Sequence, residues 1–180
     1  MHTLTDLICK TLALTESGTL TSPYDAEWRS PSEQFQSGLV THWHPVPQET
    51  PVNFDGLANA VEAPIHPDIQ AYYGSYWSGT LEANSDEGQV SLIQLWNTED
   101  FDRLIANLIG HALMKMKAGL PFTVFFANTD PDTEYFLSIE NESGQILLEE
   151  PGKPPLRVVD EDIHTFLGRL TPELREPDIY

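Results

Sequence analysis

Apolar residues three or four positions apart predict five amphipathic helices along the chain. These helices are expected over residues 4–12, 54–63, 67–76, 98–117 and 160–170. The fourth has the clearest ends, because Asn97 or Thr98 can cap its start and Gly119 stops it. Its interior Gly110 weakens a helix, which predicts that another segment packs closely there. Its expected buried stripe consists of Phe101, Leu104, Ile105, Leu108, Ala112 and Met116.

Strands are predicted where short apolar or alternating runs are bounded by turn residues. Two hairpins are expected, one from residues 79–83 and 89–96 and the other from 134–140 and 145–149. Residues 122–127 are apolar on both faces, which predicts a central strand.

Residues 19–53 lack periodicity and are rich in proline, so they are expected to form an extended connector with one strand near 39–44. The pattern predicts a single α+β domain over residues 1–180, with helices around a mostly antiparallel or mixed sheet of five to six strands. Within it, residues 1–40 hold the N-terminal helix and part of the connector.

Charge adds information that the pattern lacks. The chain has 28 acidic and 9 basic residues, a formal net charge of −19. From Ser30 to Asp102 it carries eleven carboxylates and no lysine or arginine. The negative net charge argues against nucleic acid or anionic lipid as a direct ligand, because both are negatively charged. Two explanations stay open, namely solubility in a saline cytosol and a surface that meets a strongly basic partner.

The remaining composition indicates a cytoplasmic protein. Cys9 is the single cysteine, so an intrachain disulfide is impossible, which fits a reducing compartment. The first residues lack a secretion signal, and no window approaches the ~18 apolar residues of a membrane span. Any membrane association is therefore expected to be peripheral.

Candidate chemistry is sparse. His42 and His44 have the spacing of metal ligands on one side of a strand, but a third ligand is not signalled. The alternative is two polar residues beside a buried Trp43. Asn107 and His111 share a helix face and are expected to form a hydrogen-bonded pair near the sheet. Phosphate-loop, zinc-cysteine and nucleophile-elbow motifs are absent from the sequence, so we expect no enzyme, cofactor or small-molecule substrate.

Four clustered aromatic residues follow Pro67, namely Tyr72, Tyr73, Tyr76 and Trp77. Most are expected in the core. Alternatively, one or two of them ring a groove and offer a cation–π platform to a partner's lysine or arginine.

Three blocks of sequence carry a resemblance to a known family. They are Leu95–Phe101 continued through residues 107–111, His66–Ile69 continued through residues 72–79, and residues 120–125. In order and spacing they resemble the Syd family of SecY-interacting proteins, within the SUKH superfamily. The similarity covers roughly residues 40–170. Ala118 and Gly119 stand where the family usually has a further basic residue.

This resemblance implies a non-enzymatic α+β protein that binds basic cytosolic loops of SecY through a concave acidic surface. It implies that the protein sequesters or inspects SecY that is not properly assembled, and that it reaches the inner membrane only through SecY. For the acidic surface the sequence nominates Glu62, Asp68, Glu99, Asp100 and Asp102. Asp68 and Asp100 lie within matched motifs, and the others are chosen on charge and position.

Three alternatives stay open. The nominated acids can instead be exposed residues at helix starts with no partner, since Glu99 and Asp100 favour the positive end of a helix. The protein can be an immunity protein that neutralises a basic toxin, as in the wider SUKH superfamily. It can also be a metal-dependent hydrolase that uses His42, His44 and a carboxylate.

Overall fold

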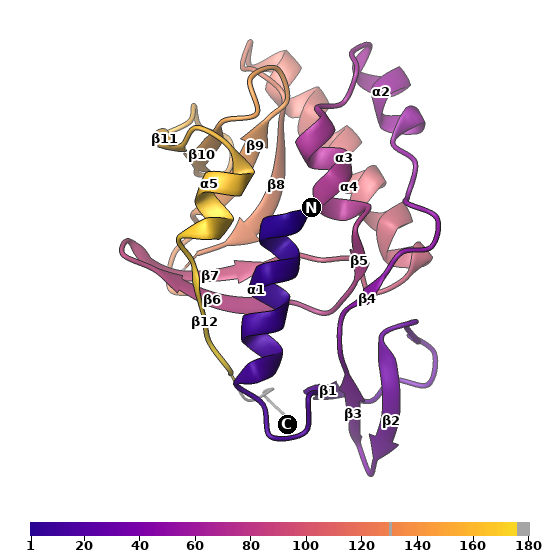
Figure 1. Ribbon diagram of the computed structural model, residues 1–180. Coiled ribbons are helices and arrows are strands. Elements are labelled where there is room, and N and C mark those ends of the chain that lie inside the picture. The colour runs from indigo at the N-terminus through magenta and orange to yellow at the C-terminus, as the bar shows by residue number, and fades with distance from the viewer. Residues whose placement is uncertain (130, 176–180) are drawn as a thin grey trace.

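A computed structural model describes residues 1–129 and 131–175 of the protein. Within these residues lie five helices, close to those expected from the sequence (Figure 1). They are α1 (His2–Ala13), α2 (Asp55–Val61), α3 (Pro67–Tyr73), α4 (Thr98–Lys117) and α5 (Ile163–Gly168). The third is shorter than predicted, because Gly74 caps its end and the next residues enter a strand.

The main sheet has seven strands, and every pair of neighbours in it is antiparallel. Its order is β11-β10-β9-β8-β7-β6-β12. The strands are β6 (Leu81–Ser85), β7 (Gly88–Leu92), β8 (Thr123–Asn128), β9 (Phe136–Glu140), β10 (Ile146–Glu149), β11 (Arg157–Asp160) and β12 (Thr171–Pro172). Both predicted hairpins and the central position of β8 are confirmed, as is the α+β class.

One face of this sheet is apolar. A row of directly paired residues crosses five strands on it, from Leu81 through Leu92, Ala127 and Leu137 to Leu148. Helices α1, α3 and α5 belong to the core on this side, where Phe126 of β8 meets Tyr72 and Phe166 edge-on. Figure 1 shows α1 and α5 side by side over the sheet.

The opposite face is mostly polar. Its corresponding row runs from Glu82 through Ser91, Asn128 and Phe136 to Glu149. Directly paired residues share a face, so this row defines the polar face of the sheet. The second half of α4 approaches this face, since His111 Nε2 lies 2.9 Å from Thr123 Oγ1 at the start of β8.

The N-terminal connector is more regular than predicted. Instead of one strand it contains β1 (Leu20–Pro23), β2 (Glu33–Ser37) and β3 (Val40–Trp43), which form a separate sheet in the order β1-β3-β2. Two further strands, β4 (Val46–Pro47) and β5 (Tyr76–Trp77), pair with each other. The prediction missed β1 and β2 because their residues are largely half-exposed or exposed. It missed β4 and β5 because each has two residues and their pairing joins distant parts of the chain.

Two details of α4 correct the sequence analysis. Met116 is 60% exposed, whereas the neighbouring Lys115 is buried. The helix turns this lysine toward the sheet because a carboxylate there neutralises it. Gly110 is exposed, and a Cβ atom placed there would meet nothing within 4 Å, so no segment among the described residues packs closely against it.

Candidate functional site

A hollow of about 820 Å³ lies between the small N-terminal sheet and the β6–β7 part of the polar face. Four carboxylates and one guanidinium line it; they belong to Asp25, Glu33, Glu82, Asp100 and Arg175. We call this depression the acidic hollow. Its lining has an excess of three negative charges, four minus one. Such a concave negative surface attracts cations and speeds their approach.

Two of the carboxylates are held by ion pairs. Arg29 Nε donates to Glu33 at 2.6 Å, which raises the pKa of the guanidinium. Glu82 accepts from the Ser91 hydroxyl at 2.6 Å and lies 3.0 Å from a guanidinium nitrogen of Arg175. These contacts fix the positions of both carboxylates.

The other two accept hydrogen bonds from backbone groups. Asp100 accepts from the Trp96 N–H at 3.0 Å, and Asp25 accepts from the Glu27 N–H at 2.9 Å. Among the described residues neither carboxylate is paired with a lysine or arginine. They are therefore the acids of the hollow most available to an incoming cation.

Three of the four tryptophans of the chain also line the hollow. Trp43 and Trp96 meet edge-on with ring centroids 5.6 Å apart, and the Arg103 guanidinium lies 4.0 Å from the ring centroid of Trp28. Trp43 is buried, and its indole N–H has no hydrogen-bond partner in the described part of the chain. The side-chain amide of Gln94, which also lines the hollow, is likewise buried without a hydrogen-bond partner among the described residues. The hollow thus combines negative charge, aromatic surface and unsatisfied polar groups.

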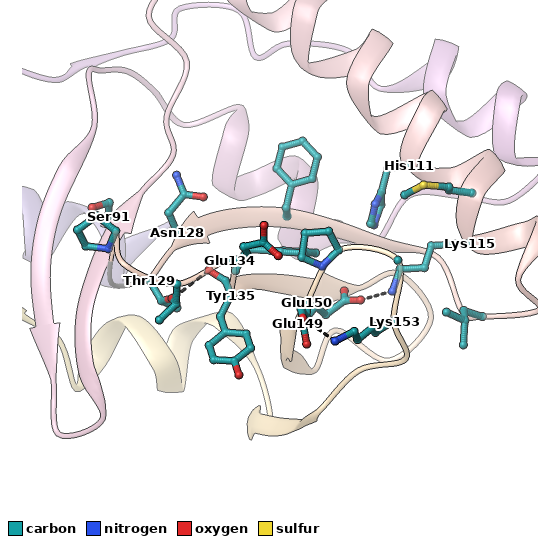
Figure 2. Close-up of a pocket in the computed structure, with 18 of the residues that line it drawn as sticks. Ser91, His111, Lys115, Asn128, Thr129, Glu134, Tyr135, Glu149, Glu150 and Lys153 are labelled. Carbon is teal, nitrogen blue, oxygen red and sulfur yellow. Dashed lines mark hydrogen bonds and ion pairs between the residues drawn. The ribbon is translucent and has the colours of Figure 1, made fainter.

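A second depression, of about 740 Å³, continues along the polar face toward α4. It is lined by three acidic residues (Glu134, Glu149 and Glu150) and three basic residues (Lys115, Lys153 and Arg175), so we call it the neutral cavity. Figure 2 shows His111 and Lys115 on one side of it and Ser91, Asn128 and Thr129 on the other.

A buried ion pair forms part of its wall. Lys115 Nζ donates to Glu149 Oε2, and the Ser138 hydroxyl donates to the other carboxylate oxygen. Burial alone would raise the pKa of Glu149, but hydrogen bonds from Lys115, Ser138 and Thr123 lower it below its ordinary value. The pKa of the neighbouring His111 is lowered, first by burial and then by the charge of Lys115.

The five nominated acids do not gather in one place. Asp100 lines the acidic hollow, whereas Glu62, Asp68, Glu99 and Asp102 line none of the depressions described above. Glu62 is the C-terminal capping residue of α2. The carboxylate oxygens of Asp68 lie 3.9 Å from His66 Nδ1 and 3.8 Å from His164 Nε2.

Sequence reasoning missed three acids of the hollow, Asp25, Glu33 and Glu82. Glu33 and Glu82 lie in the stretch without basic residues, which was the one signal available for them. Asp25 lies just before that stretch.

The structure does not contain the predicted pair of Asn107 and His111, and it arranges His42 differently from a metal ligand. Asn107 is exposed, and His111 instead contacts Thr123. The His42 ring stacks on Phe35 with centroids 4.2 Å apart, beside the buried Trp43. Over residues 1–129 and 131–175, no three His, Cys, Asp or Glu side chains are grouped to hold a metal ion. Tyr72 and Tyr73 are buried, which places them in the core as expected.

The described helices include none with the length and apolar character of a membrane span.

Comparison with known proteins gives a consistent result. Residues 1–172 match the family model described as Syd protein (SUKH-2). The chain is 38% identical to "Protein Syd" of Pseudoalteromonas atlantica (strain T6c / ATCC BAA-1087) over 153 residues, 83% of this chain and 82% of the relative. It is 42% identical to "Protein Syd" of Hahella chejuensis (strain KCTC 2396) over 135 residues, 75% and 69% of the two chains.

Proposed function

The chain belongs to the Syd family, and we propose that it is a non-enzymatic regulator that binds basic cytosolic loops of SecY in its acidic hollow. The observation that carries this proposal is the excess of carboxylates in one concavity. The choice of SecY as the partner rests on the resemblance to the Syd family of SecY-interacting proteins. Docking on SecY would hold the protein at the cytoplasmic face of the inner membrane, where it would sequester or inspect unassembled translocase.

The chemistry of the hollow suits such a partner. Cytoplasmic loops of membrane proteins carry an excess of lysine and arginine. Asp25 and Asp100 offer carboxylates to these cations, and the tryptophan rings can add cation–π contacts.

Of the five acids nominated from the sequence, Asp100 is kept in this proposal as a contact residue. Glu99 and Asp102 are exposed on the same helix end, so they add to the negative field without lining the hollow. Glu62 and Asp68 are not needed for the proposed contact.

A pair of variants with equal net charge tests the proposal. The double variant Asp25→Asn and Asp100→Asn removes two charges inside the hollow, and Glu62→Gln with Asp102→Asn removes two outside it. We expect the first to weaken binding to purified SecY in nanodiscs by roughly tenfold and the second by much less, because exposed charges contribute ~0–1 kcal/mol each. Binding of the unmodified protein should also weaken between about 0.05 and 0.3 M salt. Equal effects of the two variants would contradict a role for the hollow.

A further inference from the structure

The acidic hollow and the neutral cavity are neighbouring parts of one concave surface. Pro131 and Arg175 line both. The cross-strand row of the polar face also joins them, because Glu82 lines the hollow while Ser91, directly paired with it, lines the cavity. A polypeptide bound in the hollow therefore reaches the cavity without leaving the surface.

Of the charged side chains that line the neutral cavity, all but Glu134 are held in ion pairs among the described residues. Lys115 pairs with Glu149, Lys153 with Glu150 at 2.7 Å, and Arg175 with two glutamates outside the cavity lining. A charged ligand would have to compete with these pairs, and both signs are present in equal number. The cavity consequently lacks the charge excess that would select an ion.

Apolar side chains make up much of the remaining wall. Phe125 and Phe136 lie on the polar face of the sheet, and Leu120 follows α4. At the surface, Met114 is 53% exposed and Tyr135 is 41% exposed. Exposed methionine and tyrosine around a concavity are typical of protein-binding surfaces, where they surround an anchor side chain from the partner. The volume of about 740 Å³ accommodates such an anchor together with its neighbouring residues.

We propose that the neutral cavity receives one large apolar side chain of the same polypeptide whose cations enter the acidic hollow. This inference rests on the proposed function and refines it. The recognised segment is then basic and carries an aromatic or aliphatic anchor, so that charge brings it to the surface and apolar burial fixes its register.

Synthetic peptides test this inference with the full chain. The probes are a set of fluorescently labelled peptides made of lysine and glycine. Each peptide has one phenylalanine, at a different position from peptide to peptide, and is compared with a peptide that has alanine at that position. Burying a phenylalanine is worth ~1.5–3 kcal/mol, so the best phenylalanine peptide should bind at least about tenfold more tightly than its alanine comparator.

Two variants locate the anchor. Ala118→Trp fills the cavity from the end of α4, where Ala118 lines it and is exposed. Ala106→Trp places the same side chain at an exposed position of α4 outside the cavity lining. The gain from phenylalanine should disappear in Ala118→Trp and persist in Ala106→Trp. Thermal unfolding checks that both variants fold.

The outcomes separate the two proposals. Salt-sensitive binding without any gain from phenylalanine would overturn the anchor and leave the hollow intact. A gain that survives in Ala118→Trp would place the anchor elsewhere and also overturn the inference. If none of the lysine peptides binds, the acidic hollow fails as a binding site and the anchor fails with it.

Discussion

Gly79 lies directly against the ring of Trp43. A Cβ atom at position 79 would stand 2.6 Å from Trp43 Cζ2 and 2.9 Å from Cη2. Both residues line the acidic hollow, and Trp43 is buried there against Trp96. The position of this ring, and with it part of the shape of the hollow, therefore depends on residue 79 being a glycine, which has no side chain.

We predict that Gly79→Ala displaces Trp43 and lowers the free energy of unfolding by roughly 1–3 kcal/mol, the usual cost of overpacking. Urea unfolding followed by tryptophan fluorescence measures this change. Gly56→Ala is the control, because a Cβ atom there meets nothing within 4 Å and Gly56 lies in α2. The control should be unchanged or slightly stabilised. Equal stability of Gly79→Ala and the unmodified protein would show that the ring can move at little cost.

The buried pair of Lys115 and Glu149 predicts a large effect of a single substitution. Lys115→Met leaves a buried carboxylate without its counter-charge, which should lower the free energy of unfolding by about 3 kcal/mol. Adding Glu149→Gln should restore part of the loss, since glutamine can still accept from Ser138. Urea unfolding of the single and double variants gives both values.

Lys117→Met is the matched control for Lys115→Met, because Lys117 lies in the same helical turn but is exposed. Its stability should stay within about 0.5 kcal/mol of the unmodified protein. Similar losses in the two single variants would mean that the buried pair has no special role in stability.

His111 predicts a pH dependence of stability. Its pKa in the folded protein lies below the ordinary value of 6.5, because burial and then the charge of Lys115 disfavour the imidazolium form. The unfolded chain therefore binds the proton more readily, and the free energy of unfolding should fall as the pH drops below about 6.5 through the folded pKa. At higher pH the histidine is neutral in both states and this loss is absent.

Urea unfolding at about pH 8 and about pH 5 checks this dependence. The fall in stability between the two should be smaller in His111→Gln than in the unmodified protein, although both retain the other histidines. The carboxylate of Glu149 stays ionised over most of this range, because its pKa is lowered by its hydrogen-bond donors. An identical fall in both proteins would contradict the lowered pKa of His111.

Local sequence signals explain which parts of the fold could be predicted. Helix α4 has a capping residue at Asn97 and a glycine stop at Gly119, which adopts a positive φ of 67°. The hairpins are likewise marked by turn residues between their strands. In contrast, β4 and β5 are two residues long and pair across a large separation in sequence, so no local signal identifies them.

The site was harder to predict than the fold for the same reason. Asp100 was nominated because it lies within a matched motif in the stretch without basic residues. Glu33 and Glu82 come near it only because two separate sheets both border the hollow. Lys115 lies in the last turn of α4, where no neighbouring residue in the sequence indicates that it is buried. It is buried because Glu149, from β10, lies opposite it.

Asn97 connects the start of α4 with the acidic hollow. Its side-chain oxygen accepts from the Asp100 N–H at 2.8 Å, while its amide donates to the carbonyl of Arg29 at 2.8 Å. Arg29 in turn holds Glu33. We predict that Asn97→Ala lowers the free energy of unfolding by about 1–2 kcal/mol, since it removes both the helix cap and the buried amide.

Asn97→Ser separates these two contributions. Serine keeps a helix-capping acceptor for the Asp100 N–H but is too short to replace the amide bond to the Arg29 carbonyl, so its loss of stability should be smaller than that of alanine. Asn107→Ala, at an exposed position of the same helix, should change stability by less than about 0.5 kcal/mol. If alanine and serine at position 97 cost the same, the bond to Arg29 rather than the cap holds the start of α4 against the hollow.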